Sequence, residues 1–439
     1  MIRHLAVFVI GFLAQPLSAA MAVPDLLKDA RARPPVALNQ FEQFALAANP
    51  TLEQANAIVK QSAGRARQAG LIPNPSVGYQ GEQIRGGAYG GGEQGAFIQQ
   101  DFVLGGKLGL RRNVYEQQRL SDEIGVTEQR YRVTGDVDRT FYAALAAQAI
   151  VDVRHRLLGL AMDTVETAHQ LANVGQADAP DVLQAEVESE QAQIDYVSAQ
   201  RSYIQQFRAL AALVGKPDLP LAPLAGDLEK LPSINTDEIA DRIANESPEV
   251  KRAQQDVVRA EAELKSAKRE SVPDLEIRAG LEQNYERLAD ANPTRVGLQG
   301  FASAGITLPI FNRNQGSVAA ASADLERAKG EITRVKLSLR RSIQPLLETY
   351  LSERLEEERY KTEMIPLATR AYQLYLAKYR HMAAAYPEVI VSQRTVFQLQ
   401  VSYVNVLGDL WSNAIVLQNY LLTDGLTPPQ PAGPSAASR

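Results

Sequence analysis

Few residue types in this sequence could carry out chemistry. The 439 residues contain no cysteine, which excludes a thiol nucleophile, a disulfide framework and a cysteine–zinc site. His155 and His169 lie in one predicted helix, where their spacing corresponds to about 21 Å along the axis, too far apart to share a metal ion. We therefore predict no metal site, no cofactor and no catalytic residues. The remaining candidate ligands are His4, His381, Met162, Met364 and Met382.

The glycine-rich stretch at 85–95, RGGAYGGGEQG, superficially resembles a phosphate-binding loop. No Lys-Ser or Lys-Thr pair follows it, and it separates two predicted strands, so we expect an external loop instead. An enzyme would also need a nucleophile–base pair or a metal cluster, and the sequence shows neither. The sequence therefore argues against an enzyme.

The N-terminus predicts export from the cytoplasm, and the charge of the chain argues against one class of partner. A formal net charge of −5 makes nucleic acid an unsuitable partner. Residues 1–22 combine basic residues, an apolar core of about ten residues and small residues near Ala20 and Ala22, which predicts a cleaved export signal. The alternative is an uncleaved membrane helix, but such a helix needs roughly 20 apolar residues. No later apolar run is long enough either, so the mature chain could cross a membrane only as strands of a closed barrel.

Proline spacing indicates an internal duplication. Pro50 precedes Pro75, and Pro248 precedes Pro273, by the same interval, and helix-favouring residues fill both intervals. In each half a candidate strand, a loop and a second strand follow. We predict a first repeat at 23–214, a linker at 215–247, a second repeat at 248–424 and a disordered tail at 425–439.

The predicted strands alternate between apolar and polar residues. The clearest case is 273–282, and the strand after the next loop alternates likewise except at Phe301. We predict hairpins at 75–104 and 273–310. Alternation of this kind fits either an outer-membrane barrel wall or a half-buried soluble sheet. Four strands per chain are too few to close a barrel, so several copies would have to pool their strands.

Long helical seams follow each hairpin. No proline occurs between Lys107 and Pro180, and an apolar residue recurs every seven positions, which predicts a helix of roughly 100 Å. A second helix should continue to residue 214, and the second half should hold helices at 315–378 and 388–422. Pro345 and Pro366 should each bend the helix that contains them. The apolar seam positions are Val137, Ala144, Val151, Leu158 and Val165 in the first helix and Val187, Ile194, Val197, Ile204, Phe207, Ala211 and Val214 in the second.

From about Leu38 to Leu422 the chain resembles the TolC family of outer-membrane efflux channels. The stretches AGLIPNP, FVLGGKLGLRR, LANVGQADAPDVLQAEVE and LPIFNRNQGSVAAASADLERA carry the resemblance in family order. LGGK at 104–107 and LPIFNRNQG at 308–316 are most similar to the heavy-metal-efflux, CzcC-like branch. The resemblance implies a mixed α and transmembrane β fold, in which a homotrimer closes a twelve-stranded barrel from four strands per chain. A long α-helical coiled-coil tunnel would continue that barrel into the periplasm.

The resemblance also implies a function and partners. The chain would be the passive outer-membrane channel of a tripartite efflux system, and it would carry substrate from periplasm to exterior. Heavy-metal cations are one candidate substrate. An RND-type inner-membrane pump would supply energy, and a periplasmic membrane fusion protein would join pump to channel. A multidrug or type I secretion channel is the alternative within the family. A periplasmic coiled-coil scaffold without a barrel is the alternative outside it.

The resemblance places candidate sites at the turns between helices. Asn173, Val174, Gly175 and Asp178 would dock the fusion protein, and the alternative is that Gly175 serves only as a helix stop with positive φ. Asp181 and Glu388 would form a periplasmic gate, and the alternative is a pair of ordinary acids near helix N-termini. At the second turn this chain has Met382 where the family has glycine, so the shape of that turn differs from the family pattern.

Overall fold

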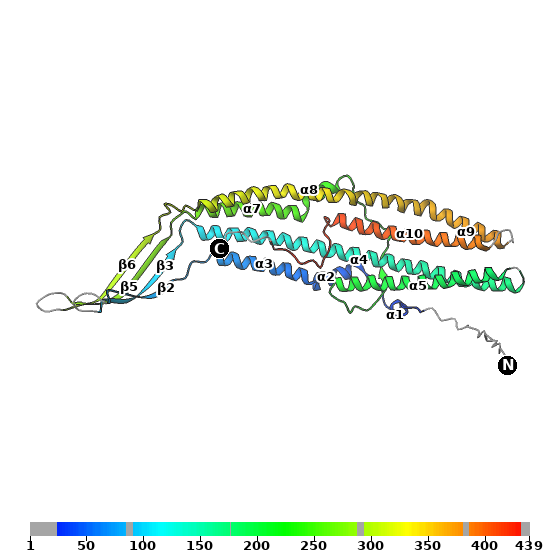
Figure 1. Cartoon of the computed structure of the whole chain (residues 1–439), viewed down its shortest axis with the longest axis horizontal. Helices are drawn as coiled ribbons and strands as arrows, with labels where there is room; N and C mark the ends of the chain where they lie inside the picture. The colour runs from blue at the N-terminus through cyan, green and yellow to red at the C-terminus, as the bar shows by residue number, and fades with distance from the viewer. Residues whose placement is uncertain (1–23, 85–90, 176, 288–293, 381–385, 432–439) are drawn as a thin grey trace, which may run out of the picture.

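The computed structural model describes residues 24–84, 91–175, 177–287, 294–380 and 386–431. The predicted export signal, His381, Met382 and the first part of the glycine-rich loop lie outside these ranges. The described chain is an elongated bundle of long helices with a four-stranded sheet at one end (Figure 1). The turn that joins the first two long helices lies at the opposite end. None of the described helices combines the length and the apolar character that a bilayer span requires.

Helices make up most of the described chain. In chain order the elements are α1 (Lys28–Arg31), β1 (Val36–Ala37), α2 (Leu38–Ala48), α3 (Pro50–Ala69), β2 (Ser76–Glu82), β3 (Glu93–Phe102), α4 (Lys107–Asn173), α5 (Ala179–Leu213), β4 (Leu224–Ala225), α6 (Ile239–Glu246), α7 (Pro248–Arg269), β5 (Leu275–Arg287), β6 (Arg295–Ile306), α8 (Gln315–Arg359), a π-helical turn (Tyr360–Met364), α9 (Ile365–Arg380) and α10 (Tyr386–Gln418).

The helices that precede the two hairpins begin in the same way. Asn49 caps α3 by accepting a hydrogen bond from Thr51 N at 2.9 Å, and Ser247 caps α7 by accepting one from Val250 N at 3.3 Å. A proline follows each cap, where its missing N–H costs nothing and its fixed φ suits a helix. Each helix then ends before the next proline, as the sequence predicted.

The core of the bundle lies where α2, α4 and α5 meet. Phe41 of α2 is fully buried, and its ring lies 5.9 Å from that of Phe141 and 6.1 Å from that of Phe207. Such aromatic contacts dominate core energetics because each ring buries a large apolar area. The seam predicted along α4 is confirmed, since Val137 and Ala144 are also fully buried.

The seam predicted along α5 is wrong for two residues within the single chain. Val187 is 62% exposed and Ile194 is 63% exposed. The buried positions in this part of α5 are Ala185, Ser189 and Ala192, whose small side chains let α5 approach its main neighbour, α4, closely. Leu183, at 61% exposure, joins Val187 and Ile194 in an apolar stripe on the outside of the helix, which we call the α5 stripe.

The second half contains the two prolines at which we predicted a bend in the helix. Pro345 lies inside α8, which is continuous around it. Pro366 follows the π-helical turn directly. A proline ring clashes with the carbonyl four residues earlier, and a local π-helical adjustment is one way for a helix to accommodate a proline. The effect of Pro366 is therefore a local change of helix type between α8 and α9.

The linker and the start of the tail pack against the helices. β1 and β4 form a short parallel pair, and Trp411 Nε1 donates a hydrogen bond to Leu228 O at 2.8 Å. The segment predicted as a disordered tail is described as far as Pro431. Thr51 Oγ1 donates to Gly425 O at 2.9 Å, and Gln129 Nε2 donates to Thr427 O at 3.2 Å. The first residues of the tail are thus held against α3 and α4.

The sheet joins the two hairpins. Its strand order is β2-β3-β5-β6, and all three pairings are antiparallel. The β3–β5 pairing brings together segments about 170 positions apart in the sequence. Both observed hairpins lie within their predicted ranges, 75–104 and 273–310. β2 and β6 are the edges of this sheet in the single chain.

Candidate functional site: the sheet and the helical tip

One face of the four-stranded sheet is apolar and exposed. Residues paired across neighbouring strands point to the same face of a sheet. Val77 pairs with Ile98, and Leu281 pairs with Gly300, so these apolar side chains lie on one face. Val77 is 77% exposed and Leu298 is 70% exposed. Exposed apolar surface on this scale marks a region that lipid or another protein covers. The alternation predicted for 273–282 and for the following strand is confirmed.

The opposite face is polar, and two phenylalanines interrupt it. Phe301 was the exception to the predicted alternation, and its ring lies against Gly280 of the neighbouring strand. A Cβ at Gly280 would stand only 2.7 Å from that ring, and Phe97 lies against Gly78 in the same way, at 2.5 Å. Glycine inside a strand marks such a close approach, so Gly78 and Gly280 were the available sequence signal.

The LGGK motif forms the junction between sheet and helices. Gly105 and Gly106 both have positive φ, 69° and 72°, which glycine adopts without steric cost. They turn the chain so that the buried Lys107 Nζ donates to Asp274 Oδ2 at 2.7 Å and to Val272 O at 2.9 Å. Burial opposes ionisation of Asp274, but Lys107 and Leu104 N–H hold the pKa of its carboxyl below the usual value. This link between the segments that flank β3 and β5 was not predicted.

The first helical turn contains the predicted docking residues. Gly175 has φ of 74°, as predicted for a sharp helix end, and its N–H donates to Ala172 O at 3.0 Å. Asn173 and Val174 are exposed, and Val174 is 66% exposed. Asp178 precedes α5, where its carbonyl accepts from Asp181 N–H. The four docking candidates therefore surround one exposed turn.

The two predicted gate acids occupy different surroundings. Asp181 is half-buried in the first turn of α5, and burial together with the Asp181 charge raises the pKa of Tyr379 in α9. Glu388 is exposed in the first turn of α10. It lines a largely apolar groove of about 420 Å³ between α9 and α10 that does not include Asp181. Both positions also fit the alternative of acids near helix N-termini.

The two helical hairpins meet near these turns. Ala168, Ala185 and Ile390 form a small buried cluster against which Tyr379 packs. Arg394 of α10 also pairs with Glu188 of α5. These contacts fix the second hairpin against the first within one chain.

The histidines lie apart in the described structure. His155 lies beside Tyr196, with ring centroids 5.3 Å apart, and His169 Nε2 lies 3.2 Å from Glu186 Oε1. Over the described ranges, no three or more histidine, aspartate or glutamate side chains form a group that could hold a metal ion.

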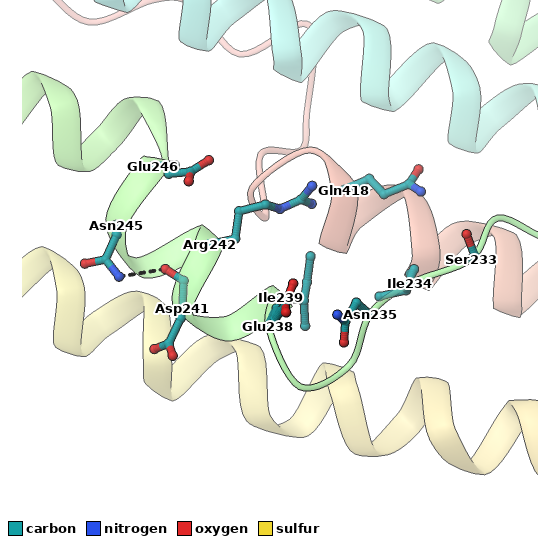
Figure 2. A pocket seen from close by; sticks show the side chains of 10 residues that line it. All are labelled: Ser233, Ile234, Asn235, Glu238, Ile239, Asp241, Arg242, Asn245, Glu246 and Gln418. Carbon is teal, nitrogen blue, oxygen red and sulfur yellow. Dashed lines mark hydrogen bonds between the residues drawn. The ribbon is translucent and has the colours of Figure 1, made fainter.

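A polar hollow of about 440 Å³ lies where the linker meets α6 and the end of α10 (Figure 2). Asn245 Nδ2 donates to Asp241 O at 2.9 Å, and Asp241 Oδ1 pairs with Arg340 at 3.2 Å. The guanidinium of Arg242 lies 5.7 Å from the Tyr420 ring centroid. Ser233 is the lining hydroxyl, and the lining includes no histidine or lysine that could activate it.

Comparison of the sequence with protein families assigns a family that agrees with this architecture. A model of the outer membrane efflux protein family matches residues 43–216 and 239–421. The chain belongs to this family. The match covers both hairpins and all the long helices, and it confirms the predicted TolC-like efflux channel of the outer membrane. The prediction that the chain is not an enzyme agrees with this family.

Proteins similar to this outer membrane efflux protein include a metal-resistance protein and membrane proteins of known structure. The chain is 26% identical over 408 residues to the cobalt-zinc-cadmium resistance protein CzcC of Cupriavidus metallidurans, covering 93% of this chain and 94% of that protein. Among solved structures, VceC of Vibrio cholerae matches with a TM-score of 0.69 and 20% identity, covering 88% of this chain and 96% of VceC. CusC matches with a TM-score of 0.70 and 18% identity, covering 88% and 92%. These structures show the same fold.

Proposed function

We propose that three copies of this chain, each built from two duplicated halves, form a passive outer-membrane channel. The observation that supports this most strongly is the exposed apolar face of the sheet, whose residues would face lipid. One sheet has two unpaired edges, β2 and β6, and a sheet of four strands cannot close on itself. Three copies would pair every edge in a twelve-stranded barrel, with the helices continuing it as a tunnel.

The helical region supports the same assembly. The α5 stripe of Leu183, Val187 and Ile194 has the spacing of a packing seam but no cover from its own chain. A neighbouring copy would bury these residues at about 25 cal/mol for each Å² of apolar surface. The apolar groove between α9 and α10, lined by Ala368, Tyr375 and Val391 among others, is a candidate receptor for such a contact.

For substrate and partners we propose a heavy-metal efflux system. The relative CzcC is named for resistance to cobalt, zinc and cadmium, and its similarity extends over nearly the whole chain. The LGGK motif, whose Lys107 links the two halves through Asp274, also resembles the heavy-metal-efflux branch of the family. An RND-type pump would drive export, and a membrane fusion protein would dock at the exposed turn of Asn173, Val174, Gly175 and Asp178.

Fractionation and growth assays test this proposal. The full chain should enter the outer-membrane fraction and run as a heat-modifiable trimer, whereas a scaffold would be released with the periplasm. In the native host, deleting its gene should lower the inhibitory concentrations of cobalt, zinc or cadmium. Sensitivity to organic drugs alone would favour the multidrug alternative. A detergent-free soluble monomer would contradict the channel itself.

Docking at the first turn predicts the effect of a charge there. Val174→Asp places a carboxylate on a residue that is 66% exposed, so the fold and the trimer should persist. Burying that charge against a partner would be costly, so we expect at least a tenfold loss of crosslinking to the fusion protein and of metal resistance. Val174→Thr, which keeps the shape of the side chain, is the control. Undiminished crosslinking by the aspartate variant would exclude this turn from docking.

The gate proposal predicts a change in conductance. Threefold symmetry would place three Glu388 carboxylates around the tunnel axis, where they would attract cations. In planar bilayers, trimers of Glu388→Ala should therefore show a lower K⁺ to Cl⁻ permeability ratio and an altered conductance. Asp181→Ala tests the second acid in the same assay. If both the conductance and the ratio of Glu388→Ala equal those of the parent, this residue is not part of a gate.

A further inference from the structure

The polar face of the sheet is organised in rows that run across the strands. Residues paired across neighbouring strands form five successive rows, beginning at the end nearest the helices. These rows are Asp101–Glu276–Gly305, Ser76–Gln99–Arg278–Ser303, Gly78–Phe97–Gly280–Phe301, Gln80–Gly95–Glu282–Gln299 and Glu82–Glu93–Asn284–Gly297. The side chains of these rows point away from the apolar face.

The formal charge differs from one row to the next. The first row carries two carboxylates, the fourth carries one and the fifth carries two. Arg278 is the one cationic side chain among the residues of these five rows. A positive row therefore lies next to an acidic row on one side, with further acidic rows beyond the aromatic row on the other.

Arg278 is held in place by its neighbours. Its guanidinium carbon lies 3.7 Å from the ring centroid of Phe97 and 5.8 Å from that of Phe301. It also donates a hydrogen bond to Gln80 Oε1 of β2. A guanidinium over aromatic faces is stabilised electrostatically and loses much of its freedom to move.

The glycines of the third row make this arrangement possible. Phe97 and Phe301 can lie close to the sheet only because Gly78 and Gly280 have no side chains in their path. Aromatic rings laid across strand glycines also cover backbone that would otherwise be exposed. One residue from each of the four strands thus contributes to the support of one positive charge.

We propose that Arg278 is a charge-selectivity residue of the pore lining, and this inference rests on the proposed trimeric channel. Three copies would form a positive ring beside the acidic rows of the wall. The guanidinium of Arg278 extends over the third row and reaches Gln80 of the fourth, the row that holds Glu282. Adjacent rows are two residues apart, about 7 Å, which is less than the Debye length of about 10 Å at 0.1 M salt. The positive ring therefore offsets part of the field of the carboxylates and limits the preference of the pore for cations.

Reversal potentials across planar bilayers under a KCl gradient test this inference. At 0.1 M mean salt, Arg278→Gln should raise the K⁺ to Cl⁻ permeability ratio about threefold or more, whereas Arg278→Lys should leave it near the parent value. Glu276→Gln, in the adjacent row, should lower the ratio. The differences should shrink near 1 M salt, where the Debye length is about 3 Å.

The outcomes separate this inference from the proposed function. Parent trimers that conduct, with a ratio unchanged in Arg278→Gln, would overturn the role of Arg278 and leave the channel intact. If Arg278→Gln does not assemble, Phe97→Leu frees the guanidinium while keeping its charge and should shift the ratio in the same direction by a smaller factor. An unchanged ratio in both Phe97→Leu and Glu276→Gln would then overturn the inference. A parent protein that forms neither trimers nor pores would overturn the proposed function as well.

Discussion

Gly95→Ala should prevent stable assembly of the sheet. Gly95 lies in β3, paired with Gln80 on one side and Glu282 on the other. A Cβ at this position would stand 2.1 Å from Leu281 O and 2.5 Å from the Cα of Glu282. Both are backbone atoms, which cannot rotate away, so β3 and β5 must separate. We expect a cost of about 3 kcal/mol or more and, on gels, loss of the heat-modifiable band of the proposed trimer.

A glycine in the edge strand β6 provides the matched control. A Cβ at Gly300 of β6 would meet its nearest neighbour, Leu281 Cδ2, at 3.5 Å, which is ordinary van der Waals contact. Gly300→Ala should therefore assemble and dissociate at a temperature close to that of the parent. Equal dissociation temperatures for Gly95→Ala and Gly300→Ala would contradict the close β3–β5 packing described here.

Asp138→Asn should stabilise the protein at alkaline pH. Burial, followed by the charge of Glu42 and a hydrogen bond to it, raises the pKa of Asp138 to about 8. In the unfolded chain this carboxyl has a pKa of about 3.9. Between these values the folded protein binds a proton that the unfolded chain does not, so the free energy of unfolding falls as pH rises from about 4 to about 8. Asparagine has no such proton, and we expect a gain of about 2–4 kcal/mol at pH 8.5 and little change at pH 4.

The single tryptophan makes this measurable. Trp411 stacks on Tyr142 at a centroid distance of 3.5 Å, and burial together with the charge of Asp138 raises the pKa of Tyr142. Tryptophan fluorescence during guanidinium unfolding therefore reports on the neighbourhood of Asp138 directly. Asp163→Asn, an exposed position on the same helix, is the control and should follow the parent at every pH. If the free energies of unfolding of Asp138→Asn and the parent depend on pH in the same way, the pKa of Asp138 is not raised in the folded protein.

Features set by local sequence were predictable. The helices end before Pro75 and Pro273 because proline cannot continue a helix, and proline is visible in the sequence. The alternation at 275–281 was visible because a strand with one apolar face has an apolar residue at every second position. The positive φ of Gly175 was predictable for the same reason. The docking and gate roles of the tip residues involve a partner or neighbouring copies, so they stay predictions.

Features set by distant contacts were not predictable. Lys107 and Asp274 are 167 positions apart, and nothing in either segment indicates that they meet. Asp138 would be placed on a solvated face by its charge alone, whereas the fold places it beside Glu42. The exposure of Val187 has a similar cause, because apolar spacing looks the same whether the cover comes from the same chain or from another.

The pairing of β3 with β5 has a consequence for biogenesis. During secretion the first hairpin is translocated about 170 residues before β5. Until β5 arrives, the backbone amides of β3 on that side are unpaired and the apolar face of the hairpin is exposed. Delayed long-range closure exposes such an intermediate to aggregation. We therefore expect maturation to depend on a holding chaperone that occupies this first hairpin until the second arrives.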